Sequence, residues 1–308
     1  MTTKIYRKSL RKIITEFNLK VGKSKPQAIT LRDLNEFQSL INAAEKDANT
    51  IVKTRLEQEM YLFYLSLQCL TSISLVLYNE TDAQDSVFPE DWLSVDGDPN
   101  PNFVLRNIVV QIVNYSLAIG TLIEDGLDYP ARAILKTNNE LIWQLLILLS
   151  NREVFVNYCQ FDTEEQSIKK WQKLFAKGKI VEHIEKLEAN LGLPKEYLKD
   201  LKLWRKDAQA FYEKSLLHSF TATHAGAFSL DFDNHEPSSA ILGTASATSI
   251  KTLEHINFQL WYCIVLFFNV LEDMCKYKIP LENEFWYRAS VCKECVMVLF
   301  LETYHSDS

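Results

Sequence analysis

The chain has 308 residues, 47% of them apolar and 12% aromatic, which suffices for the core of one large or two ordinary domains. Its 33 basic and 40 acidic residues give a net charge of −7, so the field of the whole molecule disfavours DNA and anionic membrane surfaces. The first residues lack a secretory-signal pattern, and the six scattered cysteines do not form a disulfide pattern. We therefore expect a cytoplasmic protein without a membrane contact.

Apolar residues recur at steps of three and four along most of the chain, and only eight glycines and eight prolines interrupt them. This spacing is typical of helices, so the sequence predicts an all-α fold, a multi-helix bundle with long central antiparallel helices. The most apolar run, residues 260–271, is about half as long as the ~20 residues of a membrane crossing and predicts a core helix. The predicted helices are residues 3–18, 30–48, 50–78, 103–124, 128–159, 163–176, 178–191, 195–220, 248–278 and 283–302.

Residues 1–48 are predicted to form a basic N-terminal helix and a connecting helix, and residues 49–308 the main helical bundle. The first helix has an apolar side and a strongly basic side, the latter formed by Lys4, Arg7, Lys8, Arg11 and Lys12. Such a helix suits contact with RNA, anionic lipid or an acidic partner, or docking on its own domain. The acidic loop at residues 80–98 is an intramolecular counterpart for it.

Two segments, residues 79–102 and 225–249, have the composition of surface loops. The first holds seven acidic residues and no basic one, and the second is rich in turn-forming residues, with room for a short hairpin. Long loops without secondary structure are uncommon in compact domains, so each is a candidate lid as well as a candidate plain connection.

The segment before residue 125 is apolar around most of its helical circumference, with an ordered set of polar exceptions. At 100° per residue these exceptions form one seam: Asn107, Gln111, Asn114 and Thr121. The next helix follows after the short turn DGLD, so the two helices should be antiparallel neighbours. We expect the amide seam to lie inside the bundle.

The helix after this turn carries five polar or aromatic residues on one face: Arg132, Lys136, Asn139, Glu140 and Trp143. Its C-terminal half is apolar nearly all round, so we expect the charged residues of its first half to lie partly inside the bundle. We expect Arg132 and Glu140 to meet each other or the amide seam, because unpaired buried charges cost several kcal/mol each. The face is either a satisfied structural network or a ligand or catalytic pocket.

Residues 195–220 carry an apolar stripe that continues into two polar residues: Leu201, Trp204, Ala208, Phe211, Ser215 and His218. Asp207 borders the stripe. His218 should therefore face inward one turn from Ser215, either as a core histidine or as a proton-transfer group. His224, which follows Thr221 and Thr223, is expected to face the same cavity.

The segments ARAILKTNNELIWQLLILLSNREVFVNYCQF and DAQAFYEKSLLHSF resemble a bacterial all-helical family of unknown function. That family is in turn similar in architecture to the higher eukaryotes and prokaryotes nucleotide-binding (HEPN) superfamily. Many members of the superfamily are toxin or phage-defence ribonucleases, and others bind nucleotides or only dimerise. The resemblance covers roughly residues 50–300 and reaches four site residues: Arg132, Glu140, Ser215 and His218.

The sequence departs from the nuclease motif of that superfamily. The ribonucleases place a histidine four to six residues after an arginine, and no arginine here has a histidine at that spacing. The nearest pair, Arg205 and His218, is thirteen residues apart. An assembled site, with Arg132 on a phosphate and His218 moving a proton, is the chemical alternative.

Other chemistry has weak support in the sequence. The CKEC motif at Cys292 and Cys295 has the spacing of half a zinc site, but no second close pair accompanies it. No Gly-rich phosphate loop, zinc-protease helix or hydrolase elbow is present, so we expect no metal and no cofactor. The HIEKLEANLG segment, which contains His183, is interpreted as a charged exposed helix face.

The leading hypothesis is a defence- or toxin-like protein whose polar pocket binds a nucleotide or an RNA phosphate. In it, Arg132 binds the anion, Glu140 orients it, and His218 with Ser215 carries any hydrolase or transferase reaction. Lys136, Asn139, Asp207 and His224 complete the candidate binding set. The alternative is a non-catalytic interaction protein with a purely structural polar interior, whose two apolar C-terminal helices form a homodimer.

Overall fold

The protein is an all-α helical bundle with one short β-hairpin. The computed structural model describes residues 11–16, 18–19, 31–79, 100–160, 163–176, 178–216, 228–234, 236–239 and 243–305. The principal helices are α2 (Leu31–Arg55), α3 (Glu57–Asn79), α5 (Pro101–Glu124), α6 (Asp128–Ser150), α7 (Arg152–Cys159), α8 (Glu164–Phe175), α9 (Lys179–Asn190), α10 (Lys195–Leu216), α12 (Ala247–Asn269) and α13 (Glu284–His305). The hairpin pairs β1 (Phe228–Leu230) with β2 (Pro237–Ser239), antiparallel, where the sequence leaves room for one.

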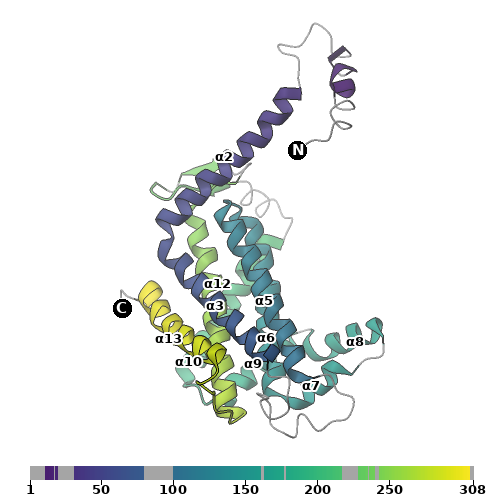
Figure 1. The fold of residues 1–308 in the computed structure, drawn as a ribbon, viewed down its shortest axis with the longest axis vertical. Helices are drawn as coiled ribbons and strands as arrows, with labels where there is room; N and C mark the ends of the chain where they lie inside the picture. The colour runs from purple at the N-terminus through teal and green to yellow at the C-terminus, as the bar shows by residue number, and fades with distance from the viewer. Residues whose placement is uncertain are drawn as a thin grey trace.

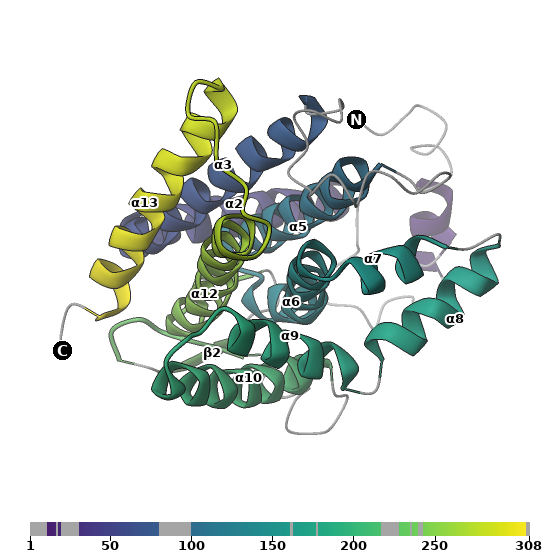
Figure 2. The same ribbon diagram turned by 90° about the horizontal axis from the view of Figure 1, so that it is seen from below.

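The helices pack in three layers. Helices α13, α3 and α5 form one outer layer, α12 and α6 the middle, and α10 and α9 the other side (Figure 2). Helix α2 extends beyond the bundle at one end, and α7 and α8 project at the other (Figure 1). The predicted domain boundary at residue 48 falls within α2, which is continuous to Arg55.

The hydrophobic core lies along the contacts of the middle layer with both outer layers. Its largest fully buried side chains include Trp286, Phe63, Phe267 and Phe268. Burial of each contributes roughly 1.5–3 kcal/mol relative to exposure. Gly120 of α5 lies against the Phe63 ring, where a Cβ atom would approach to 2.7 Å, so the close α3–α5 contact requires glycine.

Several helix ends differ from the predicted ones, and polar caps explain two of them. The predicted helix 128–159 is two helices, because the Asn151 side chain accepts a hydrogen bond from the Val154 backbone N–H at 3.1 Å and starts α7. Thr163 caps α8 in the same way through the Gln166 N–H. The break between α2 and α3 lies at Leu56, and α12 ends in a π-helical turn, Val270–Met274.

The expectation of a buried amide seam on α5 is wrong. Asn107, Gln111, Asn114 and Thr121 are all exposed, on the side that also carries the exposed side chains of Phe103 and Leu117. Because α5 packs on α3, α6 and α2, its polar stripe is the part of the circumference that remains in solvent.

The interpretation of the HIEKLEANLG segment as an exposed face is also wrong in one respect. Most of its charged residues are exposed or half-buried, but Glu188 has a relative accessibility of 0%. It belongs to the buried side of α9 together with Ile180, Ile184 and Leu187. Its charge requires a partner inside the bundle, and α10 supplies one.

The turn between α5 and α6 fixes the start of α6 against the start of α12. The Thr244 N–H donates a hydrogen bond to the Gly126 carbonyl at 2.9 Å. Gly126 and Gly243 have φ of 74° and 85°, and a Cβ on Gly243 would meet the Asp125 carbonyl at 2.4 Å. This close approach brings Asp128, at the start of α6, next to the first turns of α12.

Two helices, α3 and α5, are long and apolar enough to cross a membrane by length and composition alone. Such helices also form the cores of bundles, and both pack here against neighbouring helices. At the N-terminus, residues 11–16 and 18–19 are helical, with Ile13 and Leu19 exposed. The other residues of the predicted N-terminal helix, the acidic loop and a minor part of segment 225–249 lie outside the described residues.

Candidate functional site

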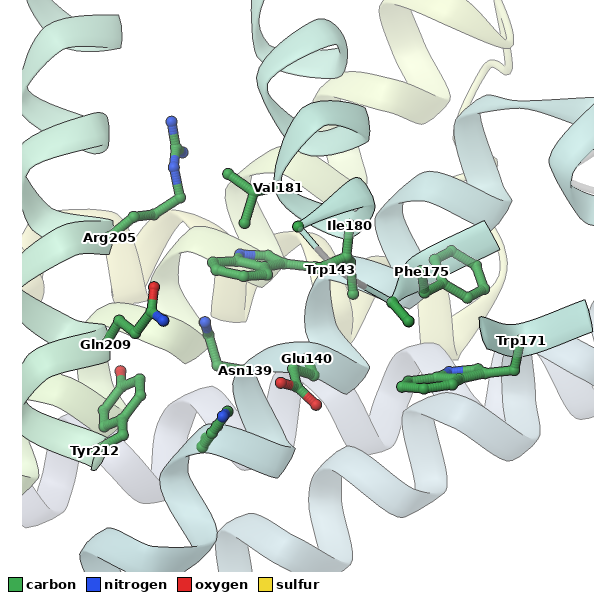
Figure 3. Close-up of a pocket in the computed structure, with 13 residues that line it drawn as sticks. Asn139, Glu140, Trp143, Trp171, Phe175, Ile180, Val181, Arg205, Gln209 and Tyr212 are labelled. Atoms are coloured by element: carbon green, nitrogen blue, oxygen red, sulfur yellow. The ribbon is translucent and has the colours of Figure 1, made fainter. Parts of the chain in front are cut away.

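A pocket of about 340 Å³ lies where α6, α9 and α10 meet the end of α8 (Figure 3). Trp171 reaches from α8 toward Glu140, and Gln209 and Tyr212 of α10 lie on the opposite side (Figure 3). The lining residues are Lys136, Asn139, Glu140, Trp143, Trp171, Phe175, Ala176, Gly178, Ile180, Val181, Arg205, Gln209 and Tyr212.

Helix α6 supplies the polar floor of the pocket. Lys136, Asn139, Glu140 and Trp143 follow steps of three, one and three, which place them on one helical face. The sequence predicted this shared face, and the structure brings these four residues together. The opposite face of α6 packs into the core through Leu135, Ile142 and neighbouring residues, and this packing orients the pocket residues.

Three residues that line the pocket have buried polar atoms without a hydrogen-bond partner in the described protein: Asn139 Oδ1, Trp143 Nε1 and Arg205 Nε. Asn139 is 96% buried, at a relative accessibility of 4%. Buried polar atoms are nearly always bonded, and an unsatisfied one costs about 1–3 kcal/mol. The wall of the pocket therefore holds two donors and one acceptor without a partner among the described residues. These atoms are enclosed, so a bound group reaches them only where the lining side chains shift.

Glu140 is the carboxylate of the pocket. Burial raises the pKa of Glu140 above its usual value, and the positive charge of Lys136 acts in the opposite direction. Protonation of Glu140 is thus easier than for a carboxylate in water. A group with this property can accept hydrogen bonds when ionised and can donate a proton to a ligand when protonated.

Arg205 is held at the pocket wall by a buried network. Its Nη1 donates to Glu188 Oε1 at 2.6 Å, and its Nη2 lies 3.5 Å from Glu185 Oε1. The Tyr262 hydroxyl from α12 donates to the same Glu188 oxygen at 2.6 Å. Burial and the Glu188 charge raise the pKa of Tyr262 well above its usual value, so the hydroxyl keeps its proton. The network fixes α9, α10 and α12 against one another.

A second network lies behind Tyr212. The Gln259 amide donates to the Tyr212 hydroxyl at 2.7 Å and to the Leu135 carbonyl at 3.1 Å. Its Oε1 accepts a hydrogen bond from Asn138 Nδ2 at 3.1 Å. Asn138 and Gln259 are completely buried, so the position of Tyr212 in the pocket is set by fully enclosed amides.

Arg132 is not in the pocket, and the expected contact between Arg132 and Glu140 is wrong. Arg132 Nη2 pairs with Asp128 Oδ2 at 2.5 Å, and its Nε donates to Thr252 Oγ1 at 3.0 Å. Asp128 also accepts hydrogen bonds from the hydroxyls of Thr248 and Thr252. The guanidinium lies over the Phe211 ring, 4.7 Å from its centroid. These contacts make Arg132 a structural link between α6 and α12.

A histidine that sequence reasoning missed lies beside this cluster. The His255 ring of α12 stacks on Phe211 with a centroid distance of 4.2 Å. Burial lowers the pKa of His255 to about 4, so the ring is neutral at pH 7. Its Nδ1 is buried without a partner in the described protein. His255 lies one turn after Thr252 on a largely apolar helix, and this position could have predicted an inward-facing histidine.

The remaining predicted residues divide into two groups. Asp207 is exposed on α10, away from the lining of the pocket, and its charge acts on His255. Ser215 is the penultimate residue of α10, but its side chain lies outside the described part of the structure, as do His218 and His224. Their convergence with Glu140 stays a prediction.

Among the described residues, no group of three histidine, cysteine or acidic side chains lies close enough together to bind a metal ion. Cys292 of the CKEC motif is buried on α13, whereas Cys295 is exposed.

No family model, curated protein or solved structure matches this chain.

Proposed function

We propose that the pocket between α6, α8, α9 and α10 binds a nucleotide. Its walls combine aromatic rings with a small number of convergent polar groups, the usual make-up of a small-molecule site. Trp171 provides a ring face for a base, and Lys136 provides a cation for a phosphate.

The polar groups of the pocket suit the edge of a base that carries amino or imino N–H groups. The Glu140 carboxylate and Asn139 Oδ1 are acceptors, and Trp143 Nε1 is a donor. A base with N–H donors beside a carbonyl or ring nitrogen satisfies all three. Guanine fits best, because its N1–H and amino group face the same direction and can both donate to one carboxylate.

The observation that carries the proposal is the set of unpartnered buried polar atoms around one pocket. The network around Gln259 satisfies its own buried groups. Asn139 and Trp143, which line the pocket, each keep one polar atom without a partner in the described part of the protein, and a ligand or solvent in the pocket is the candidate partner.

If the ligand also reacts, Glu140 serves as the acid or base of a hydrolase or transferase reaction only when the reacting group, and not the base edge, lies against it. Glu140 is the one carboxyl group among the described residues that line the pocket, and burial raises its pKa, which makes it a better proton acceptor than a carboxylate in water. In this proposal the phosphate-binding role passes from Arg132 to Lys136. A role for His218 in the same chemistry remains part of the proposal.

Binding is tested by titrating the protein with nucleosides, nucleotides and a single-stranded RNA while following tryptophan fluorescence and heat. We expect Trp171→Ala to weaken binding about tenfold or more, because loss of a base-stacking aromatic costs about 1–3 kcal/mol. The matched control is Tyr197→Ala on α10, since Tyr197 is an exposed aromatic that does not line this pocket. Absence of binding to every ligand at millimolar concentration would reject the proposal.

A second candidate function is self-association, favoured by a specific surface. The outer side of α13 exposes Tyr287, Val291, Val298 and Leu301, which recur at steps of four, seven and three. Helix α3 in the same layer exposes Tyr61, Tyr64, Leu75 and Tyr78. Exposed apolar and aromatic residues that recur along two packed neighbouring helices are typical of a protein interface, so we propose the outer side of α13 with its α3 neighbour as the homodimer surface.

A further inference from the structure

A second pocket, of about 420 Å³, adjoins the first. The two pockets share the wall residues Trp143, Val181, Arg205 and Gln209. The second pocket extends along α10 toward its N-terminal half, where the additional lining residues are Glu185, Lys199, Lys202, Leu203 and Lys206. The two pockets are therefore neighbours, and a ligand that extends past these four residues from the first pocket reaches the second.

The second pocket is strongly basic. Lys199, Lys202 and Lys206 follow steps of three and four on α10, so their exposed side chains share one face. Arg205 at the same wall is paired with the buried Glu188, so the three exposed lysines stand against the one remaining carboxylate, Glu185, and leave a net charge of +2. The whole chain has a net charge of −7, so this local cluster has the opposite sign to the molecule as a whole.

The three lysines of this row are largely free to bind a ligand, whereas Arg205 is paired with Glu188. Lys202 Nζ lies 3.9 Å from Glu185 Oε1, a loose pair of exposed side chains, and Arg205 Nη2 lies 3.5 Å from the same oxygen. Lys199 and Lys206 have no ion pair among the described residues. Lysine ammonium groups bind phosphate as mobile point charges, which suits a flexible chain of phosphates.

We propose that the ligand is a nucleoside polyphosphate, with its base in the first pocket and its phosphate chain along Lys199, Lys202 and Lys206 in the second. This inference rests on the proposed function of the first pocket. The first pocket alone offers Lys136 to a single phosphate, whereas the adjoining row matches the three or four negative charges of a diphosphate or triphosphate.

The test compares a nucleoside with its monophosphate and triphosphate in the full-length protein, in magnesium-free buffer at low and high salt. Three exposed lysine–phosphate contacts, each worth a factor of about 1.5–5, predict about tenfold tighter binding of the triphosphate than of the nucleoside at low salt. This gain should shrink at high salt because exposed charges are screened. The triple variant Lys199→Gln, Lys202→Gln and Lys206→Gln should bind the triphosphate as weakly as the nucleoside.

The control is a triple variant with the same change in net charge at exposed lysines far from the pockets: Lys46→Gln, Lys53→Gln and Lys278→Gln. It should bind the triphosphate like the wild type. Equal affinity of the wild type for nucleoside and triphosphate, or an equal loss in both triple variants, would overturn the lysine row but leave the base pocket standing. Absence of binding by every nucleoside and nucleotide would instead reject the proposed function. A single-stranded RNA that binds far more tightly than the triphosphate, through the same lysines, would assign the row to a nucleic acid backbone.

Discussion

At the scale of single residues, Arg132 differs most from its expected role. Its guanidinium is only 15% exposed and is bonded to Asp128, to the Thr252 hydroxyl and to the Thr248 carbonyl. We expect Arg132→Ala to lower the free energy of unfolding by about 2–4 kcal/mol, because it leaves the Asp128 carboxylate buried with two hydroxyl partners. Urea unfolding measures the loss, and nucleotide affinity should change less than twofold in the folded fraction.

The matched control is Arg288→Ala on α13. Arg288 and Glu284 form an i,i+4 pair of similar length, 2.7 Å, but their side chains are 44% and 73% exposed. Exposed pairs contribute about 0–1 kcal/mol, so this variant should be nearly neutral. Equal losses in the two variants, or a loss of ligand binding in Arg132→Ala alone, would show that our structural assignment of Arg132 is mistaken.

Replacement of Glu140 should have the opposite effects to replacement of Arg132: the protein should gain stability and lose affinity for the ligand. Burial raises the pKa of Glu140 in the folded state, so the folded protein binds a proton more readily than the unfolded chain. The free energy of unfolding therefore falls as the pH rises from the unfolded-state pKa of about 4.3 through the raised pKa of the folded state. Above both pKa values the destabilisation by the buried carboxylate is complete. We expect Glu140→Gln to be more stable than the wild type at pH 7 and to lose that advantage below pH ~4.

The two readouts for Glu140 are thermal unfolding across this pH range and ligand affinity at pH 7. A variant that gains stability while losing affinity is typical of a residue retained for function. A Glu140→Gln protein that is less stable at pH 7 would mean that the carboxylate stabilises the fold. Thr137→Ala, on the exposed side of the same helix, should alter neither quantity.

The pocket was predictable from the sequence only in part. The period of α6 was sufficient to group Lys136, Asn139, Glu140 and Trp143, because a helix fixes which residues share a face. The same reasoning could not exclude Arg132 from the group, since its partners Thr248 and Thr252 are more than a hundred residues away. Contacts between distant elements depend on packing that a single helical period does not encode.

At the scale of helices, the Glu188–Arg205–Tyr262 network fixes three elements around the pocket. Glu188 has a side-chain accessibility of 1%. Removal of one member of a buried ion pair leaves the other charge uncompensated, so we expect Glu188→Ala to cost about 3–5 kcal/mol. Urea unfolding of Glu188→Ala, Arg205→Ala and the double variant should show strong non-additivity, since the two side chains share one interaction.

Glu185→Ala is the control for this network. Glu185 lies on the same helix within 3.5 Å of Arg205, but its side chain is 38% exposed. The Glu185→Ala variant should lower the free energy of unfolding by less than about 1 kcal/mol. Additive losses in the double variant would mean that Glu188 and Arg205 stabilise the bundle separately, and that the pocket wall is not held by their pair.

The sequence contained a signal for this network: a charged residue within the apolar period of each of two neighbouring helices. The many other charged residues of these helices made it easy to miss. Glu188 follows Ile180 and Ile184 at steps of four, and Arg205 falls between Leu201 and Ala208 on the packed side of α10. A charged residue within an apolar period indicates a buried pair when two neighbouring helices each carry one of opposite sign. By contrast, the break between α6 and α7 depends on the Asn151 cap. The apolar period continues through this position, so the period alone does not predict the break.

At the scale of the whole molecule, the pocket and the apolar face lie on opposite sides of the bundle. The pocket lies among α6, α8, α9 and α10, whereas α13 and α3 form part of the opposite outer layer (Figure 2). Helices α3 and α13 are antiparallel, because Glu59 and Tyr304 both contact Asn257, and Cys69 contacts Ala289. Because the pocket lies away from this layer, association of two copies through it would leave both pockets open.

Self-association through this face makes a prediction that is independent of the pocket. The double variant Val298→Glu and Leu301→Glu places two charges among exposed apolar residues, each now 55% exposed. If the face is the dimer surface, the wild type should be a dimer by light scattering at micromolar concentration and the variant a monomer, because desolvation of unpaired carboxylates opposes association. Both positions are exposed, so the unfolding free energy of the monomer should change by no more than about 0.5 kcal/mol each.

Ile168→Glu on α8 is the matched control, since Ile168 is similarly exposed, at 51%, but lies away from the α3 and α13 layer. It should leave the mass of the wild-type particle unchanged. A wild-type protein that stays monomeric up to about 100 times that concentration would remove self-association as a function of this surface. A dimer that survives the α13 charges but dissociates with Ile168→Glu would instead place the interface beside the pocket, where a second copy could narrow the entrance for the ligand.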